Sequence, residues 1–334
     1  MSSISHGYQH WTGESTGLWQ RRWTITGYGL RLCWQSRFLK ILFAVAWVGA
    51  LFLMGFFFLV GQLLTPDSSL VTTITENLGK QAQSVINGLS AWILLYPEVS
   101  VDGLYRLVFS WASQLYSMLA FFAVALFVPK LIAHDLASNA ILIYSSKALS
   151  RFDYILGKFG IAFTLLGLLC LAPLIAVWFV GNLLSPDWGF FYHGFPALLR
   201  AVTVGLLAVT TYSLLAMAVS SLAKRTSSAT AFWILAWIIS GMIANTTGRF
   251  VSWGRFLSPA TCLDHISRHL YDLSGVLDKA KAMLPFFQST LDRLPRRNPL
   301  NVIPASDGLW LPLIFLLAFW ALCFFAISKR VQTE

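Results

Sequence analysis

Charged side chains are scarce in this sequence. Its 334 residues include 24 Lys and Arg and 14 Asp and Glu, so that 11% are charged, against roughly 25% in an average soluble domain. Apolar residues make up 57% of the chain and aromatic residues 15%. One soluble core could not bury that much apolar surface, and a disordered chain needs the opposite composition. The composition therefore excludes a soluble enzyme and indicates a polytopic membrane protein.

Cysteine is rare as well. Four cysteines are too few for a disulfide framework, and no Cys-x-x-Cys pair suggests a zinc or redox motif. His265 and His269 are four residues apart, with Asp264 and Cys262 nearby, and this spacing could hold a metal. Two histidines on the polar face of a helix explain the same pattern, so we expect no metal site.

The sequence also lacks a phosphate-binding loop. Gly79-Lys80 and Gly157-Lys158 have no glycine five residues earlier, which such a loop requires. We therefore expect no nucleotide site, no catalytic residue and no cofactor of its own. The centres of the apolar runs contain no Asp, Glu, Lys or His, where ion-coupled transporters place ionisable groups. This argues against a secondary transporter.

Six apolar runs approach the length of about 20 residues that crosses a bilayer. They are 41–64, 105–128, 157–184, 197–222, 229–244 and 310–327. They predict an all-α polytopic membrane protein, with the whole of 1–334 forming one transmembrane domain. Tryptophans and arginines at helical spacing predict an amphipathic surface helix over 17–40. Apolar residues at three- and four-residue steps predict an extracytoplasmic helix over 263–284.

The basic residues predict the orientation. Five Lys and Arg precede the first span, and four more lie in or just after the loop 129–156, whereas the outer segments after spans one and three carry only Lys80, Arg106 and Arg200. The positive-inside rule then places both termini in the cytoplasm, as an even number of spans requires. The outer loop 245–309 has eight Lys and Arg, but the rule loses force in loops of this length. We expect a multi-pass protein of the cytoplasmic (inner) membrane.

The segment 134–158, HDLASNAILIYSSKALSRFDYILGK, follows the second span. It contains an acidic residue, a small-residue turn, an apolar stretch, a Ser-rich break and a basic-aromatic end: Asp135, Asn139, Ile141, Leu142, Tyr144, Lys147, Arg151, Tyr154 and Lys158. This order resembles the loop after the second span in type-2 ABC exporter permeases. The small-residue run at 218–223, followed by Lys224-Arg225, resembles the link after the fourth span of that family.

The resemblance implies a permease subunit that forms the translocation path of an ATP-driven exporter. Its partners would be separate ABC ATPase subunits, which bind the ATP, a second permease subunit in a homo- or heterodimer, and the lipid bilayer, with no nucleic acid. The resemblance makes the loop a coupling helix. Its docking residues would be Asp135, Asn139, Ile141, Leu142, Tyr144, Lys147 and Arg151, with Tyr154 and Lys158 anchoring span three. A non-transporting scaffold or assembly subunit, or a secondary transporter, remains the alternative.

Overall fold

The computed structural model describes residues 17–64, 95–138, 150–183, 189–223, 225–283 and 308–332, together with residues 88, 90, 91 and 93. Every regular element within these ranges is a helix. Six helical segments of the described chain are long and apolar enough to cross a membrane. The chain is therefore an all-α polytopic membrane protein, as the composition predicts.

All six predicted spans are confirmed. They are α2 (Arg37–Leu64), α4 (Pro97–Phe127), α7 (Arg151–Leu166) with the π-helical turn η2 (Gly167–Leu171) and α8 (Ala172–Leu183), α9 (Gly189–Leu222), α10 (Thr226–Phe250) and α15 (Trp310–Gln332). Several begin or end well beyond the predicted limits. Polar residues at the helix ends lower the local hydropathy, so the apolar runs mark only the part of each helix that suits lipid.

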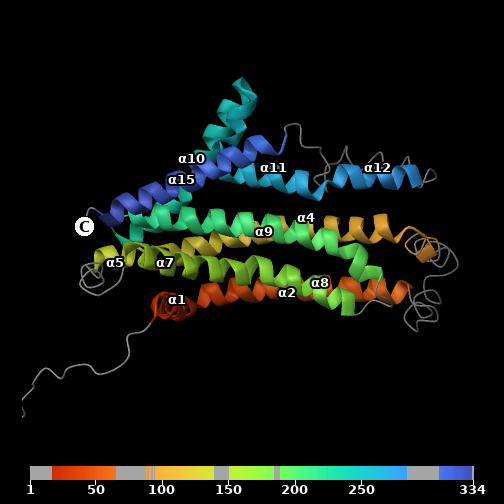
Figure 1. Cartoon of the computed structure of the whole chain (residues 1–334), viewed down its shortest axis with the longest axis horizontal. Helices are drawn as coiled ribbons and strands as arrows, with labels where there is room; N and C mark the ends of the chain where they lie inside the picture. Colours follow the sequence, from red (N-terminus) through yellow and green to blue (C-terminus); the bar gives the residue numbers. More distant parts are fainter. Residues whose placement is uncertain are drawn as a thin grey trace, which may run out of the picture.

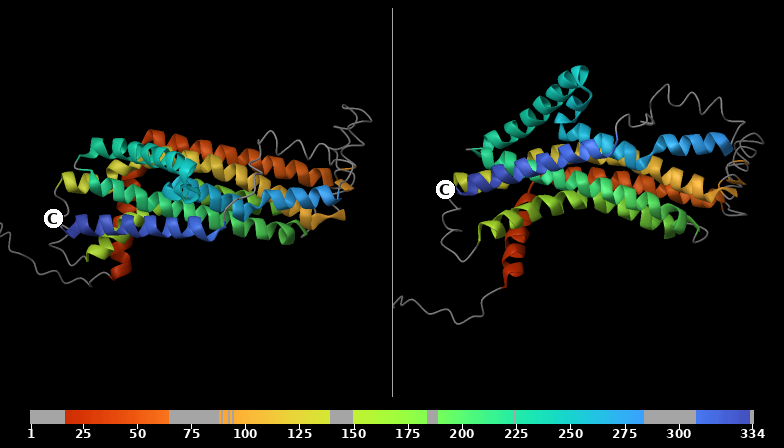
Figure 2. Two further views of the ribbon diagram at one scale, coloured as in Figure 1. Left: turned by 90° about the horizontal axis from the view of Figure 1, so that it is seen from above. Right: turned by 45° about the horizontal axis from the view of Figure 1, so that its top comes forward.

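Four of the spans form the body of the molecule. Helices α2, α4, α7–α8 and α9 run along the long axis side by side, and α15 packs on α9 (Figures 1 and 2). Helix α10 diverges from this bundle and is attached mainly through its first half (Figure 1). There Trp233 is buried and its indole N–H donates a hydrogen bond to the carbonyl oxygen of Phe121 at 3.1 Å. Most of the apolar surface of α10 is consequently exposed.

One end of the bundle, here called the basic end, carries α1 (Leu18–Trp34), the short helix α5 (Ala133–Ala137) and the last turn of α15 (Figure 1). Its basic residues include Arg21, Arg22, Lys130, Lys158, Lys329 and Arg330. Since α1 and the C-terminal helix end lie there together, the chain crosses the bundle an even number of times.

Helix α1 runs across the basic end and not along the bundle (Figure 2). Trp19 and Trp23 are 72% and 65% exposed, whereas Thr26 and Cys33, further along the helix, are buried. An exposed aromatic face on a crosswise helix suits the interface of a bilayer. A helix is thus present where the surface helix was predicted, although it stops at Trp34, before α2 begins.

The prediction of one helix over 263–284 is wrong. The structure has two helices, α11 (Pro259–Tyr271) and α12 (Leu273–Met283), which follow one another along the other half of the bundle (Figure 1). They are separated by Asp272, whose φ of 43° lies in the left-handed region that Asp tolerates better than most residues. Its carboxylate accepts a hydrogen bond from the amide of Gly275 at 3.1 Å and so supports the start of α12. Apolar spacing continues across the break and hides it in the sequence.

A buried ionic group lies near the end opposite the basic end. Asp102 and Arg106 of α4 form an ion pair, and Nη1 of Arg200 on α9 lies 3.6 Å from Oδ1 of Asp102. Arg106 and Arg200, expected in the outer segments, belong to the helices themselves because they pair within the protein. Arg106 lies in α4 and Lys130 three residues beyond its end, so the two are separated by about 36 Å at 1.5 Å per residue, slightly more than the hydrocarbon core of about 30 Å. A charged layer thus lies towards each end of the second span.

Candidate functional site

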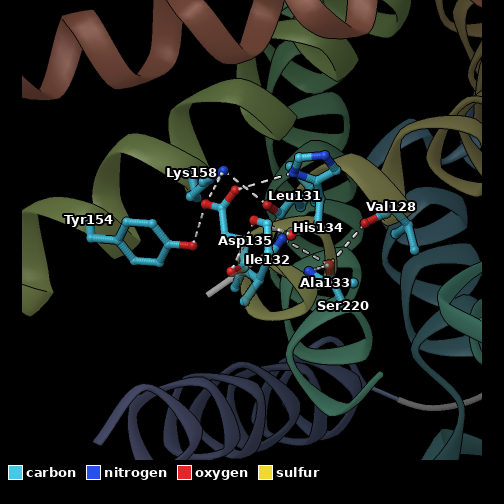
Figure 3. A network of polar contacts seen from close by, with 10 residues as sticks. Val128, Leu131, Ile132, Ala133, His134, Asp135, Tyr154, Lys158 and Ser220 are labelled. Atoms are coloured by element: carbon cyan, nitrogen blue, oxygen red, sulfur yellow. Dashed lines mark hydrogen bonds and ion pairs between the residues drawn. The ribbon is translucent and has the colours of Figure 1, made fainter. Parts of the chain in front are cut away.

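The chain turns sharply at the basic end, where the second span finishes. The 3-10 turn η1 (Val128–Lys130) is followed by α5. The hydroxyl of Ser220 on α9 donates a hydrogen bond to the carbonyl oxygen of Val128 at 2.9 Å. The Oγ atom of Ser220 also accepts hydrogen bonds from the amides of Ile132 and Ala133, each at 2.9 Å (Figure 3). One fully buried side chain of span four thus satisfies three backbone groups of this turn.

The carboxylate of Asp135 in α5 is the centre of a second set of contacts. Nζ of Lys158 lies 2.7 Å from Oδ2 of Asp135, and the hydroxyl of Tyr154 donates to the same oxygen at 2.8 Å. Lys158 also donates to the carbonyl oxygen of Leu131 at 2.9 Å. Asp135, Tyr154 and Lys158, here called the Asp135 cluster, are only 6%, 4% and 7% exposed (Figure 3). The cluster joins α5, which precedes the segment 139–149 in the sequence, to α7, which follows it.

Burial makes the Asp135 cluster dependent on both of its charges. Moving an ion pair out of water is repaid only when the geometry is good and the remaining polar atoms are hydrogen-bonded. Here the carboxylate has an ammonium and a phenol as partners, and the ammonium also has a carbonyl. Loss of either charge would leave the other buried and uncompensated, at a cost of about 3–5 kcal/mol. His134 contributes less, because its side chain is 57% exposed and its Nδ1 lies 3.8 Å from Oδ1 of Asp135.

A second ion pair ties α1 to the start of α7. Nη2 of Arg22 lies 2.6 Å from Oδ1 of Asp153, and Nε of Arg22 donates to the same oxygen at 2.6 Å. Ser150 caps α7, since its hydroxyl oxygen accepts a hydrogen bond from the amide of Asp153 at 3.1 Å. An acidic residue in the first turn also suits the positive end of the helix dipole. The first turn of span three is thereby fixed to the crosswise helix.

Small residues allow α1 and α7 to approach closely. A Cβ atom added to Gly157 would lie 2.9 Å from the Cβ of Ile25, and one added to Gly29 would collide with Ile161. The hydroxyl of Thr26 donates a hydrogen bond to the carbonyl oxygen of Gly157 at 3.0 Å. Backbones this close leave no room for a side chain, so α1 and the first turns of α7 form one packed unit.

The structure brings three of the predicted site residues together: Asp135, Tyr154 and Lys158. Arg151 lies exposed on the first turn of α7. Asn139, Ile141, Leu142, Tyr144 and Lys147 lie outside the described residues. Because Asp135 is buried, its part in any docking would be to hold the ends of the loop and not to contact a partner directly.

Sequence reasoning missed the contribution of Ser220. In the sequence, Ser220 and Ser221 stand out only as members of the small-residue run 218–223, and the hydroxyl of Ser221 indeed donates within its own helix, to the carbonyl oxygen of Ala218. Ser220 instead reaches the turn after span two, across 88 residues of sequence. The ion pair of Arg22 with Asp153 spans 131 residues and was missed for the same reason. A single sequence does not indicate that a basic residue of α1 and an acidic residue at the start of α7 form an ion pair.

Mechanically, the site fixes both ends of the segment 139–149 to three spans and to α1. Among the described residues, no group of three or more His, Cys, Asp or Glu side chains could hold a metal ion. Comparison with models of protein families found no match, and no curated protein matches the chain either. What the site does must therefore be argued from its own residues.

Proposed function

We propose that this chain is the permease subunit of an ATP-driven ABC exporter. The observation that carries the proposal is the Asp135 cluster. The acidic residue after span two and the Tyr and Lys at the start of span three, which carry the resemblance to type-2 exporter permeases, are in direct contact. A loop that transmits motion needs its two ends held in a fixed relation. The contact of Asp135 with Tyr154 and Lys158 would hold them so.

Separate ATPase subunits would bind the segment 139–149. The chain has no phosphate-binding loop of its own, so the motion that drives transport has to come from a partner. The apolar residues Ile141, Leu142 and Tyr144 would supply the buried contact, and Lys147 and Arg151 the polar margin.

Movement of that segment would pass directly into the membrane part. Asp135 and Lys158 hold its two ends to each other, Ser220 holds the preceding turn to span four, and Arg22 holds Asp153 to α1. A displacement of the loop of a few ångströms would therefore shift the ends of spans two, three and four together. Packed elements of this kind move as rigid bodies because their interfaces do not deform continuously.

A second permease subunit would complete the translocation path. In the most apolar 18-residue stretch of α2, α10 and α15, only 22%, 17% and 22% of the residues are buried within the chain. Such faces suit lipid or a second subunit. The path would lie between the two copies, and the basic end of each copy would face the cytoplasm.

The test is co-purification of an ATPase with the full chain in its native membrane. The double variant Ile141→Ala, Leu142→Ala loses two apolar contacts worth about 1.5–3 kcal/mol each when buried. It should therefore bind the ATPase more than about a hundredfold more weakly, and co-purify with much less of it, while reaching the membrane normally. The matched control is Leu183→Ala, which shortens an exposed leucine at the other end of the bundle. Equal ATPase recovery from the wild type and the double variant, or no ATPase with any of them, would refute the proposal.

A further inference from the structure

The interior of the bundle contains a cavity of about 210 Å³. Its walls come from α4, from the third span around η2, and from α9, α10 and α11. All of these elements belong to one chain. The cavity therefore needs no second subunit to form it.

The inner wall of the cavity is apolar. Ala120, Leu166, Val204, Ala208 and Trp237 line it. Two serine hydroxyls of the wall form hydrogen bonds within the protein: Ser117 with Tyr212 at 2.6 Å, and Ser113 with Tyr271, which lies outside the lining, at 2.8 Å. The apolar side chains of the wall favour an apolar group over water.

The rim of the cavity is polar. Gln114, Asp264 and Ser267 contribute to the lining, and Gln114 is exposed. Oδ2 of Asp264 lies 2.7 Å from Nη2 of Arg268, and the Asp264 side chain is 39% exposed, so the carboxylate keeps room for a further partner. Arg268 does not line the cavity. The only formal charge that the lining itself presents is therefore negative.

The cavity is bordered by an irregular turn of the third span. The π-helical turn η2 supplies Cys170 to the lining, and Leu166 lies directly before it. Next to it, Gly205 of α9 leaves no space for a side chain, because an added Cβ would collide with Cδ2 of Leu171. π-helical turns insert a residue into a helix and occur frequently at functional sites. Here the turn places Cys170 in the lining.

From this lining we infer a binding site for a small single-chain amphiphile with a hydrogen-bond-donating head, an alcohol or an amine. The chain would occupy the apolar interior against Trp237 and Ala208, and the head would donate to Asp264 at the rim. An apolar cavity of about 150 Å³ already admits a benzene ring, whereas a drug-sized ligand needs about 300 Å³ or more. The size selects a short chain, and the carboxylate selects against an anionic head.

Photolabelling tests this inference on the full chain in lipid nanodiscs. The probe is a diazirine-bearing octanol, and the labelled positions are mapped by mass spectrometry of peptides. Labelling should concentrate on peptides that contain Tyr116, Tyr212 or Trp237. Octanol and octylamine should compete with the probe, and octanoate should compete about tenfold more weakly because its head repels Asp264. Labels spread over lipid-facing residues only, or equal competition by octanoate, would overturn the inference.

Two substitutions on α9 provide a matched pair. Ala208→Trp fills the cavity and should abolish competable labelling, whereas Leu206→Trp adds the same side chain on an exposed position and should leave labelling unchanged. Thermal unfolding of both variants shows whether each is folded. If Ala208→Trp does not fold, Asp264→Asn serves instead. It should weaken competition by octylamine about fivefold and leave octanol nearly unaffected. Unchanged labelling in a folded Ala208→Trp variant, or unchanged competition by octylamine in Asp264→Asn, contradicts the site.

Discussion

Asp135 and Lys158 lie 2.7 Å apart, although 139–149 and the first turn of α7 separate them in the sequence. The pair closes a loop at the point where spans two and three reach the basic end. Tyr154 and the carbonyl of Leu131 complete its hydrogen bonds, so neither charge is left without a partner. A buried pair of this kind holds α5 against the first turns of α7.

Loss of one charge from this pair should destabilise the protein strongly. Lys158→Met should lower the free energy of unfolding by about 3–5 kcal/mol, because Asp135 would remain buried without a counter-charge. Thermal or denaturant unfolding in mild detergent measures this. The double variant Asp135→Leu, Lys158→Met removes both charges and should be markedly more stable than the single variant. Equal stability of the two would show that the charges are not coupled.

Ser220→Ala should open the turn after span two. Its hydroxyl serves three backbone groups, and leaving buried groups unpaired costs about 1–3 kcal/mol. Hydrogen exchange should become faster at the amides of Ile132 and Ala133, which lose their acceptor. Ser221→Ala is the neighbouring control and should leave these amides protected, since Ser221 bonds only to Ala218. Unchanged exchange in Ser220→Ala would remove the proposed link to span four.

Gly157→Val should separate α1 from α7. The added side chain would collide with Ile25, whereas Gly49→Val in α2 meets no atom within 4 Å. Limited proteolysis should therefore cut within α1 of the Gly157 variant and spare α1 in the Gly49 variant. A protected α1 in both variants would mean that the contact yields without loss of packing.

The thiol of Cys33 should react slowly. Burial raises the pKa of Cys33 from 9.0 to about 11, although Lys130 and Lys158 favour the thiolate. At pH 8 the thiolate is then about a hundredfold rarer than for an unperturbed thiol. Because the folded-state pKa is the higher one, the thiol form contributes stability below pH 9, and this contribution is lost as the pH rises towards 11.

Maleimide modification measures the reactivity of Cys33. In a variant that retains only this cysteine, labelling at pH 8 should be slow and should become fast after denaturation. A variant with Gln35→Cys as its only cysteine is the control, because Gln35 is exposed, and it should label rapidly in the folded state. Rapid labelling of folded Cys33 would show that α1 leaves the bundle.

Orientation can be tested with two exposed positions in a cysteine-free background. Ser138→Cys lies at the basic end and Tyr192→Cys near the start of α9, at the other end. An impermeant thiol reagent applied to intact cells should label position 192 and leave position 138 unlabelled until the cells are opened. The reverse pattern would place both termini outside the cytoplasm.

The sequence predicted the spans well because lipid imposes one simple requirement, a long apolar run, on each of them. It could not place the ends of the helices, since Asp102, Arg106 and Arg200 are tolerated there only through pairing across α4 and α9. The break at Asp272 was invisible because the apolar spacing continues on both sides. For the candidate site, the motif singled out Asp135 as a docking residue and Tyr154 and Lys158 as anchors of span three, but it did not predict that the three are in contact. Ser220 and Arg22 could not be predicted, because their partners lie far away in the chain.

The two charged layers at Arg106 and Lys130 have a consequence for the surrounding lipid. The bundle cannot slide along the bilayer normal without drawing one layer of ions into hydrocarbon, so its depth is fixed from both sides. Bilayers thinner or thicker than the spacing of about 36 Å between these two residues would have to deform around the protein or tilt it, at a fraction of a kcal/mol per ångström of mismatch. Membrane thickness would thus act on the ends of spans two and four. At the basic end, these span ends also hold the segment 139–149.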